Sequence, residues 1–199
     1  RFAYSIYLCA GILTWNFFTE IVSRCQNVFL EHANLLKKLS FPRICLPVVV
    51  IASASFNFAV VFSLFLLFLL LTGNWPGNAL FAFVAVLALQ IAFATGLGIL
   101  LGVLNVFFRD VGHLVGIALQ FWFWATPIVY PMGILSERVR PWVELNPLTP
   151  LMAAYQQILT QGAWPVWQSL LPSAVTAAVC CLLAVMLFKR RSGEMVDEL

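Results

Sequence analysis

Residues 44–72 read ICLPVVVIASASFNFAVVFSLFLLFLLLT and contain no charged side chain. A helix needs about 20 apolar residues to cross the roughly 30 Å hydrocarbon core of a bilayer, so this stretch predicts a transmembrane helix. The whole chain has the same character: of 199 residues, 62% are hydrophobic and 10% are charged, and the mean hydropathy is +0.96. Soluble domains are near half apolar and about a quarter charged. The composition therefore excludes a soluble single-domain enzyme and indicates a polytopic membrane protein.

Four further stretches are long and apolar enough to cross a membrane. The predicted fold is an all-α polytopic membrane protein with about five transmembrane helices in one domain, residues 1–199. Pro127 and Pro131 are expected to bend or end the fourth and shortest span, because proline lacks a backbone N–H. The five predicted spans are Phe2–Val22, Ile44–Thr72, Ala79–Phe107, Leu114–Tyr130 and Trp167–Phe188.

The basic residues gather on alternate connections, and this pattern predicts the orientation. Eight of the 11 lie on one side, whereas Arg1, Arg138 and Arg140 lie on the other. The positive-inside rule places the eight, and the C-terminus with them, in the cytoplasm of a bacterial inner membrane. Five spans then place Arg1 outside, so we expect a further span upstream of it. The eight are Arg24, Lys37, Lys38, Arg43, Arg109, Lys189, Arg190 and Arg191.

The connection Met132–Val166, on the predicted outer side, is punctuated by prolines and glycines but is not polar throughout. Thr149 followed by Pro150 is typical of an N-cap with proline at the first helical position. Gly162 is a plausible end for the helix that follows. We predict one or two short re-entrant helices here, packed on protein or facing a water-filled cavity, because backbone at that depth needs hydrogen-bond partners.

No motif in the chain is typical of a metal, nucleotide or catalytic site. A GxxxxGK[ST] phosphate loop is missing, so any ATP and Mg²⁺ are expected on another chain, and no cofactor is expected on this one. A net charge of +3 gives no reason to expect nucleic acid as a partner. His32 and His113 are far apart, and the cysteines form no CxxC pair, which favours small buried hydrophobic roles over zinc or disulfides. The cysteines are Cys9, Cys25, Cys45, Cys180 and Cys181.

Two segments on the predicted cytoplasmic side are candidates for contact with a soluble partner. Residues 31–43, EHANLLKKLSFPR, predict a short amphipathic helix that ends at Pro42. Either a membrane-surface helix or a helix that docks in a groove of a partner fits this pattern. Residues 105–112, NVFFRDVG, carry Arg109 and Asp110, which suit either a membrane-edge ion pair or a second contact with the same partner.

Glu20 lies near the cytoplasmic end of the first predicted span, with Asn16 and Thr19 beside it in sequence. A charged side chain at the bilayer centre costs about 2.5–3.5 kcal/mol on the insertion scale. We therefore expect Glu20 to pair with Arg24 one helical turn later. A proton relay is the alternative, although a single carboxylate is a thin basis for one.

Aromatic residues are abundant, with 18 Phe, 7 Trp and 4 Tyr. Residues 121–124 read FWFW, so their side chains point all round a helix and at least one must face the interior. Flat aromatic faces suit sugar rings, but interfacial belts and lipid-facing positions use the same residues. The pairs Gly98/Gly102 and Gly112/Gly116 have GxxxG spacing, which predicts close helix packing.

Five stretches in this order resemble the permease subunit of type-2 ABC exporters, in the polysaccharide and O-antigen branch. They are GILTWNFFTE at 11–20, NLLKKLSFPR at 34–43, LNVFFRDVGHLV at 104–115, TPIVYP at 126–131 and LNPLTPLMAAYQQIL at 145–159. The resemblance implies six spans in the full family, with an upstream interfacial helix and first span that this sequence does not contain. It also implies a homodimer, a separate cytoplasmic ATPase and a lipid-linked glycan as cargo.

The resemblance also implies roles for particular residues. The segment that matches the family's coupling helix, with the nearby turn, is expected to contact the ATPase: Asn34, Leu35, Leu36, Lys37, Lys38, Phe41, Pro42, Arg43, Arg109 and Asp110. Aromatic residues expected along the glycan path are Trp122, Trp124 and Tyr130. The outer gate is expected to contain Pro131, Asn146, Pro147, Pro150 and Tyr155.

Other functions remain open from the sequence. Teichoic acid, a capsule polymer, a drug or a lipid could replace the O-antigen-like cargo in the same kind of exporter. A secondary transporter would need buried ion-coupling charges, for which Glu20 is the candidate. A membrane enzyme acting on lipid-linked sugars would need His113, Asp110 or Glu20 to be catalytic.

Overall fold

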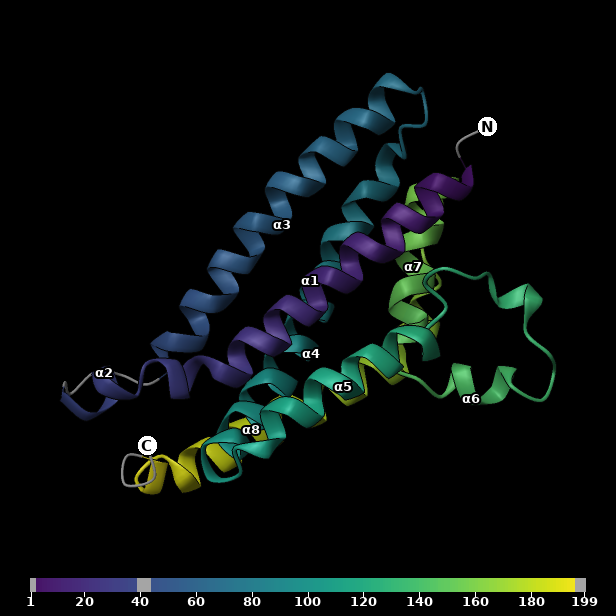
Figure 1. Ribbon diagram of the computed structural model, residues 1–199. Helices are drawn as coiled ribbons and strands as arrows, with labels where there is room; N and C mark the ends of the chain where they lie inside the picture. Colours follow the sequence, from purple (N-terminus) through teal and green to yellow (C-terminus); the bar gives the residue numbers. More distant parts are fainter. Residues whose placement is uncertain (1–2, 39–43, 196–199) are drawn as a thin grey trace.

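The computed structural model describes residues 3–38 and 44–195, and within them every regular element is helical (Figure 1). The α-helices are α1 (Ala3–Glu31), α2 (Ala33–Lys38), α3 (Cys45–Leu71), α4 (Leu80–Phe107), α5 (Asp110–Ala125), α6 (Arg140–Glu144), α7 (Leu148–Gln161) and α8 (Leu171–Arg191). Short 3₁₀ turns, η1 (Gly77–Ala79), η2 (Met132–Ile134) and η3 (Trp167–Leu170), precede α4, α6 and α8.

Four stretches are helical, long and apolar enough to cross a membrane: Ala3–Glu31, Cys45–Leu71, Gly77–Phe107 and Trp167–Arg191. They coincide with the first, second, third and fifth predicted spans, and they indicate a multi-pass membrane protein. The first helix is longer than predicted, because α1 continues past Val22 without a break for nine more residues. Its 29 residues extend over about 43 Å at 1.5 Å per residue, which is more than the hydrocarbon core needs.

The fourth predicted span is the exception. Instead of Leu114–Tyr130, the helix α5 covers Asp110–Ala125, and its 16 residues rise only about 24 Å. The helix ends because Thr126, directly before Pro127, is extended (φ −106°, ψ 136°), as a residue that precedes proline prefers. The bounds of the fourth predicted span are therefore corrected: its helix begins four residues earlier and ends five residues earlier than predicted, and it is shorter than the four long helices.

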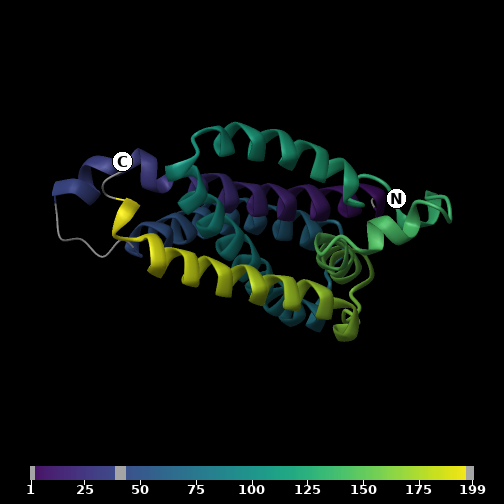
Figure 2. The same ribbon diagram turned by 90° about the horizontal axis from the view of Figure 1, so that it is seen from below.

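The helices form three layers, with α1 and α4 in the middle. Figure 2 shows α5 on one side of this pair and α8 on the other. The most extensive contacts join α4 to α8 and to α1, whereas α3 packs mainly on α1. The N-terminal end of α1 and the α3–α4 turn lie at one end of the molecule, and α2 and the C-terminal end of α8 lie at the other (Figure 1). This arrangement brings the basic connections to one end, as the sequence predicted.

Glycines bring the backbones of the central helices together. A Cβ at Gly98 would lie 2.7 Å from Cys25 Cβ, and one at Gly102 would lie 2.7 Å from the Cys25 carbonyl oxygen. The first glycine pair therefore packs α4 onto α1, as its spacing predicted. The second pair behaves differently, because a Cβ at Gly116 would meet nothing within 4 Å. Gly116 thus faces open space.

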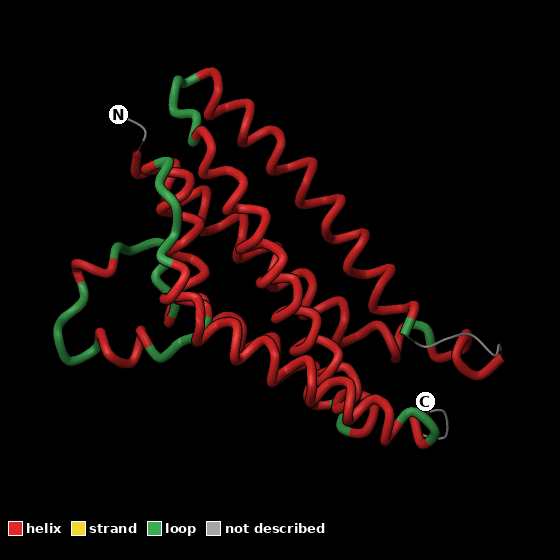
Figure 3. The backbone as a smooth tube through the Cα atoms, turned by 180° about the vertical axis from the view of Figure 1, so that it is seen from behind, coloured by secondary structure: helices red, strands yellow, loops and turns green. Residues whose placement is uncertain are grey.

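The connection between α5 and α8 contains two short helices, α6 and α7, and among the described residues it has the most extensive non-helical backbone (Figure 3). The predicted start of α7 is wrong by two residues, because its N-cap is Pro147 and Thr149 already lies in the helix. The Thr149 hydroxyl donates to the Val143 carbonyl (2.6 Å) instead of capping. Pro150 is tolerated at the third helical position because the first N–H groups of a helix lack intrahelical partners. Gly162 ends α7 as predicted, in the left-handed region at φ 61°.

The region 31–43 departs from the single helix predicted there. Helix α1 ends at Glu31, and α2 begins at Ala33 and ends at Lys38. Leu39, Phe41, Pro42 and Arg43 lie outside the described residues.

The expectation that all five cysteines are buried is also wrong. All five thiols are free, but only Cys25 is buried: Cys9 is exposed, and Cys45, Cys180 and Cys181 are partly exposed. The exposed positions lie on helix faces that the core of one chain does not cover.

Replacing Gly102 by alanine should destabilise the protein, because the added methyl group would overlap the Cys25 carbonyl of the neighbouring helix. We expect a loss of about 1–3 kcal/mol, measured as a lower thermal midpoint of the purified protein in detergent. Gly116→Ala is the matched control, because its methyl group meets no neighbour and alanine favours the helix. Equal effects of the two substitutions would show that close packing at Gly102 does not stabilise the fold.

Candidate functional site

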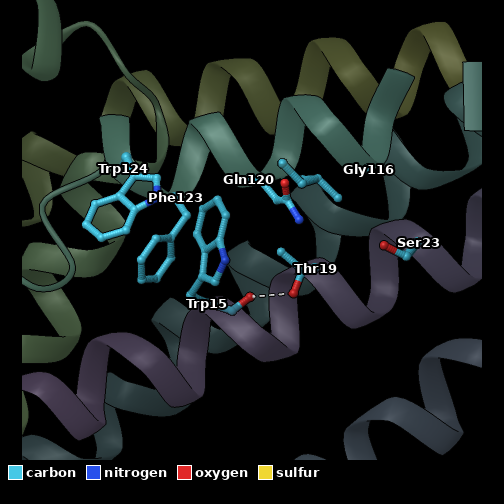
Figure 4. A pocket seen from close by; sticks show the side chains of 8 residues that line it. Trp15, Thr19, Ser23, Gly116, Gln120, Phe123 and Trp124 are labelled. Atoms are coloured by element: carbon cyan, nitrogen blue, oxygen red, sulfur yellow. Dashed lines mark hydrogen bonds between the residues drawn. The ribbon is translucent and has the colours of Figure 1, made fainter. Parts of the chain in front are cut away.

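A groove of about 540 Å³ lies between α1 and α5 and opens on one face of the molecule (Figure 4). We call it the α1/α5 groove. Residues of α1 form one wall and residues of α5 form the other. The lining residues are Trp15, Thr19, Ser23, Gly116, Leu119, Gln120, Phe123 and Trp124.

Helical periodicity explains why these residues share the groove. Trp15, Thr19 and Ser23 recur every four residues, so they form one stripe along α1. On α5, Gly116, Gln120 and Trp124 recur in the same way and face that stripe, as Figure 4 shows. Gly116 has no side chain and leaves room between the two walls.

The lining combines aromatic faces with neutral polar groups. Trp15 packs edge-to-face on Phe123 at 5.7 Å between ring centroids, and Phe123 meets Trp124 at 5.4 Å. The Thr19 hydroxyl donates to its own helix, to the carbonyl of Trp15 (3.2 Å). Gln120 is exposed, Ser23 is partly exposed, and no lining residue is ionisable. Such a surface can stack on and hydrogen-bond with a neutral polar ligand without fixing a charge.

Of the three aromatic residues predicted along a glycan path, the structure places only Trp124 in the groove. Trp122 lies on the other side of α5, where it packs edge-to-face on Phe18 at 5.8 Å. Its indole N–H donates to Asn146 Oδ1 at 2.8 Å. Tyr130 lies beyond the end of α5, and its hydroxyl donates to the Trp124 carbonyl at 2.9 Å.

Asn146 joins α5 to the start of α7. Its Oδ1 accepts the Trp122 indole N–H and the Leu148 backbone N–H (3.1 Å). Its Nδ2 donates to the Thr126 hydroxyl at 2.8 Å. One side chain therefore orients Trp122, starts α7 and holds the end of α5.

The backbone carbonyls of the non-helical stretch 126–130 accept hydrogen bonds from side chains that were not predicted from the sequence. The hydroxyls of Tyr4 and Tyr7 donate to the carbonyls of Val129 (3.2 Å) and Tyr130 (3.1 Å). The Gln156 amide donates to the carbonyl of Pro127 at 3.2 Å. Backbone at membrane depth needs such partners. The spacing of two tyrosines three residues apart at the N-terminal end of α1 was the available signal.

The remaining predicted gate residues occupy different environments. Pro131 is exposed and lines a second hollow of about 310 Å³ together with Tyr4 and Tyr7. The Pro147 carbonyl accepts the Ser173 hydroxyl of α8 at 2.5 Å. Tyr155 is fully buried against Phe83, at 5.0 Å between ring centroids, and burial raises the pKa of its hydroxyl well above the ordinary value. Tyr155 thus packs in the core, and a gate role for these positions stays a prediction.

At the opposite end, the two predicted coupling segments adjoin the groove walls. Asn34 and Leu36 lie on α2, exposed and buried respectively, and the backbones of Leu35, Lys37 and Lys38 continue that helix. Arg109 and Asp110 are both exposed at the start of α5. The predicted ion pair between them is not among the salt bridges of the described residues.

Asn105 fixes the α4–α5 turn to α1. Its Oδ1 accepts the Gly112 N–H at 2.9 Å, and its Nδ2 donates to the Gln26 carbonyl at 3.3 Å. Asn105 is buried, so the start of α5 is held firmly beside α1.

The predicted pair of Glu20 and Arg24 is confirmed at 2.9 Å. The pair also bonds to α3, because Arg24 donates to the Ser53 hydroxyl (3.2 Å) and Asn57 donates to Glu20 Oε1 (3.2 Å). Glu20 is therefore compensated by a cation and an amide, and it links α1 to α3. Within residues 3–38 and 44–195, no group of three His, Cys, Asp or Glu is placed to hold a metal ion.

Replacing Asn146 by alanine should destabilise the junction between α5 and α7, since the Trp122 N–H and the Leu148 N–H would both lose their acceptor. We expect a loss of about 1–3 kcal/mol, read from the thermal midpoint and from a changed tryptophan emission spectrum. Asn74→Ala is the control, because the Asn74 amide bonds only within its own exposed turn. An unchanged midpoint for Asn146→Ala would contradict the joining role.

A protein-family model and three known relatives all point to the same family. Residues 1–160 match the model of the ABC-2 type transporter family. An O-antigen export system permease protein RfbA of Myxococcus xanthus is 30% identical over 198 residues, which are 98% of this chain and 76% of the relative. Two proteins of the same name from Klebsiella pneumoniae are each 25% identical over 160 residues, 80% of this chain and 62% of theirs. With its apolar helices and this match over most of its length, the chain belongs to the ABC-2 type transporter family.

Proposed function

We propose that this chain is the membrane permease subunit of an ABC exporter that moves a lipid-linked, O-antigen-like polysaccharide outward across the bacterial inner membrane. The names of the relatives support the cargo class, since all three are O-antigen export system permease proteins. The chain is a transport subunit, and ATP with its Mg²⁺ binds to a separate cytoplasmic ATPase. No cofactor is required on the permease itself.

The α1/α5 groove is the observation that carries the proposal. Sugar rings present apolar C–H faces and hydroxyl rims, and the groove offers aromatic rings beside the amide of Gln120 and the hydroxyl of Ser23. The lining has no ionisable group, so it does not hold one sugar by a strong charged contact. A polymer that must slide needs many weak contacts of this kind.

The exposed face around the groove supports a homodimer. Polar groups such as Gln120 are costly against lipid, so the open side of the groove needs a cover that is not acyl chain. The neighbouring surface of α5 is apolar and exposed at Leu114, Ile117 and Phe121. A second copy packed on this face encloses the two grooves in one passage.

The two walls of the groove connect directly to the proposed ATPase contacts. The long α1 runs from the outer end through Trp15 to Glu31, directly before α2. The shorter α5 begins at Asp110, beside Arg109. A helix transmits displacement as a rod because its backbone hydrogen bonds are internal. When nucleotide binding moves the ATPase, motion at α2 and at the α4–α5 turn therefore reaches both walls of the groove. The C-terminus lies on the same, cytoplasmic side as these two segments.

The structure gives less support to a secondary transporter. Its candidate coupling group, Glu20, accepts hydrogen bonds from Arg24 and Asn57 and is already charge-compensated. A group in such a pair is poorly placed to take up and release protons during transport.

Trp124→Ala should slow polysaccharide export about two- to tenfold, the range expected for the loss of one aromatic stacking contact. Polysaccharide at the cell surface is measured over time, together with the amount of permease in the membrane. Trp142→Ala is the matched control, because Trp142 is also an exposed tryptophan and lies outside the groove. Equal slowing by both substitutions would contradict a role of the groove.

Reversing both charges in Lys37→Glu/Lys38→Glu should reduce co-purification of the ATPase by roughly tenfold, since repulsion would replace attraction at the docking segment. Arg138→Glu/Arg140→Glu changes the net charge equally at the opposite end and should leave the complex intact. Unchanged ATPase binding with the first variant would remove α2 from the interface. Loss of binding with both would indicate a general effect of charge.

A further inference from the structure

A third cavity, of about 380 Å³, lies on a different side of the molecule from the α1/α5 groove. We call it the α4/α8 cleft. It is formed by α4, α8 and the residue before α3, Ile44. Its lining residues are Ile44, Thr95, Gly96, Ile99, Cys181, Ala184, Val185, Phe188 and Lys189.

The cleft begins where α4 and α8 touch. A Cβ at Gly96 would lie 2.7 Å from the Cys181 backbone nitrogen, so the two helices are in backbone contact there. From Cys181 to Lys189 the cleft follows α8 for about 12 Å toward the end that holds α2. Figure 2 shows α8 on the side opposite α5, so a second copy packed on the α5 face leaves the cleft toward the bilayer.

The lining is predominantly apolar, and its one charged group lies at one end. Ile99, Val185 and Phe188 give a hydrocarbon surface, and Lys189 is the only charged residue of the lining. An acyl chain gains little from leaving the bilayer for such a surface, because lipid tails are as apolar as the side chains. The choice of lipid must therefore come from the headgroup that the charged end meets.

Lys189 is exposed at the end of the cleft. Of the three basic residues in the last turn of α8, Arg191 pairs with Glu194 and lies over the Phe107 ring at 5.7 Å. In the described parts of the chain, 3–38 and 44–195, Lys189 has no ion-pair partner, and its side chain is exposed. An ammonium group at the end of an apolar cleft complements a phosphate joined to an acyl chain.

We propose that the α4/α8 cleft binds one anionic glycerophospholipid, with an acyl chain between α4 and α8 and its phosphate at the Lys189 ammonium group. The bound lipid holds α4 and α8 together at the end where the coupling segments lie. The proposal does not depend on the cargo of the transporter or on the ATPase interface.

Native mass spectrometry of the full chain, released from detergent with equal amounts of phosphatidylglycerol and phosphatidylcholine of the same acyl chains, tests this site. We expect one lipid to be retained, with phosphatidylglycerol favoured about fivefold, the factor that one basic side chain near the membrane surface supplies. Lys189→Gln should abolish the preference. Arg190→Gln is the matched control, because it removes the same charge next to the cleft without changing the lining.

Val185→Trp provides a second variant, because Val185 is half exposed and a larger side chain there fills the cleft without disturbing the core. It should reduce retention of both lipids, with an unchanged thermal midpoint in detergent alone. Equal retention of the two lipids by the unsubstituted chain would overturn the proposal. So would equal losses of preference in Lys189→Gln and Arg190→Gln, or full retention in Val185→Trp.

Discussion

The backbone contact between α1 and α4 is the constraint on which the rest of the structure depends. Gly98 and Gly102 let α4 approach Cys25 so closely that a methyl group has no room. This contact fixes the rotation of α1 about its own axis, because one face of the helix packs on α4. The stripe of Trp15, Thr19 and Ser23 is then left to face α5 and forms a groove wall.

Helix α1 also carries several polar side chains, and each of them needs an ion pair or a hydrogen bond inside a membrane. Near its middle, Glu20 and Arg24 compensate each other and bond to α3. At its N-terminal end, Tyr4 and Tyr7 donate hydrogen bonds to the carbonyls of the stretch 126–130, which allows α5 to be short. Toward the other end, the Gln26 carbonyl accepts a bond from Asn105, which holds the start of α5. Side-chain hydrogen bonds thus tie α1 to α3, to the α4–α5 turn and to the stretch 126–130.

Much of the fold follows from the sequence, because long apolar stretches predict membrane helices and the distribution of basic residues predicts which helix ends lie together. The four long helices, the pair of Glu20 and Arg24 and the end of α7 at Gly162 agree with the predictions. Features that depend on contacts between residues far apart in the sequence could not be predicted from it. Four consecutive aromatic residues point in all directions, and the inward position of Trp122 rests on distant partners: Asn146, 24 positions away, and Phe18 of α1. The start of α7 was misplaced because Asn146, rather than Thr149, bonds to its first N–H.

Contact between the polysaccharide and the α1/α5 groove is the central claim, and site-specific photocross-linking in cells that make the polysaccharide tests it most directly. A photoreactive amino acid at Gln120 is compared with one at Leu182, which is exposed on α8 at the other side of the molecule. The account predicts that the permease cross-links to polysaccharide from position 120 and to lipid alone from position 182. Polysaccharide cross-links at position 182, with none at position 120, would contradict it.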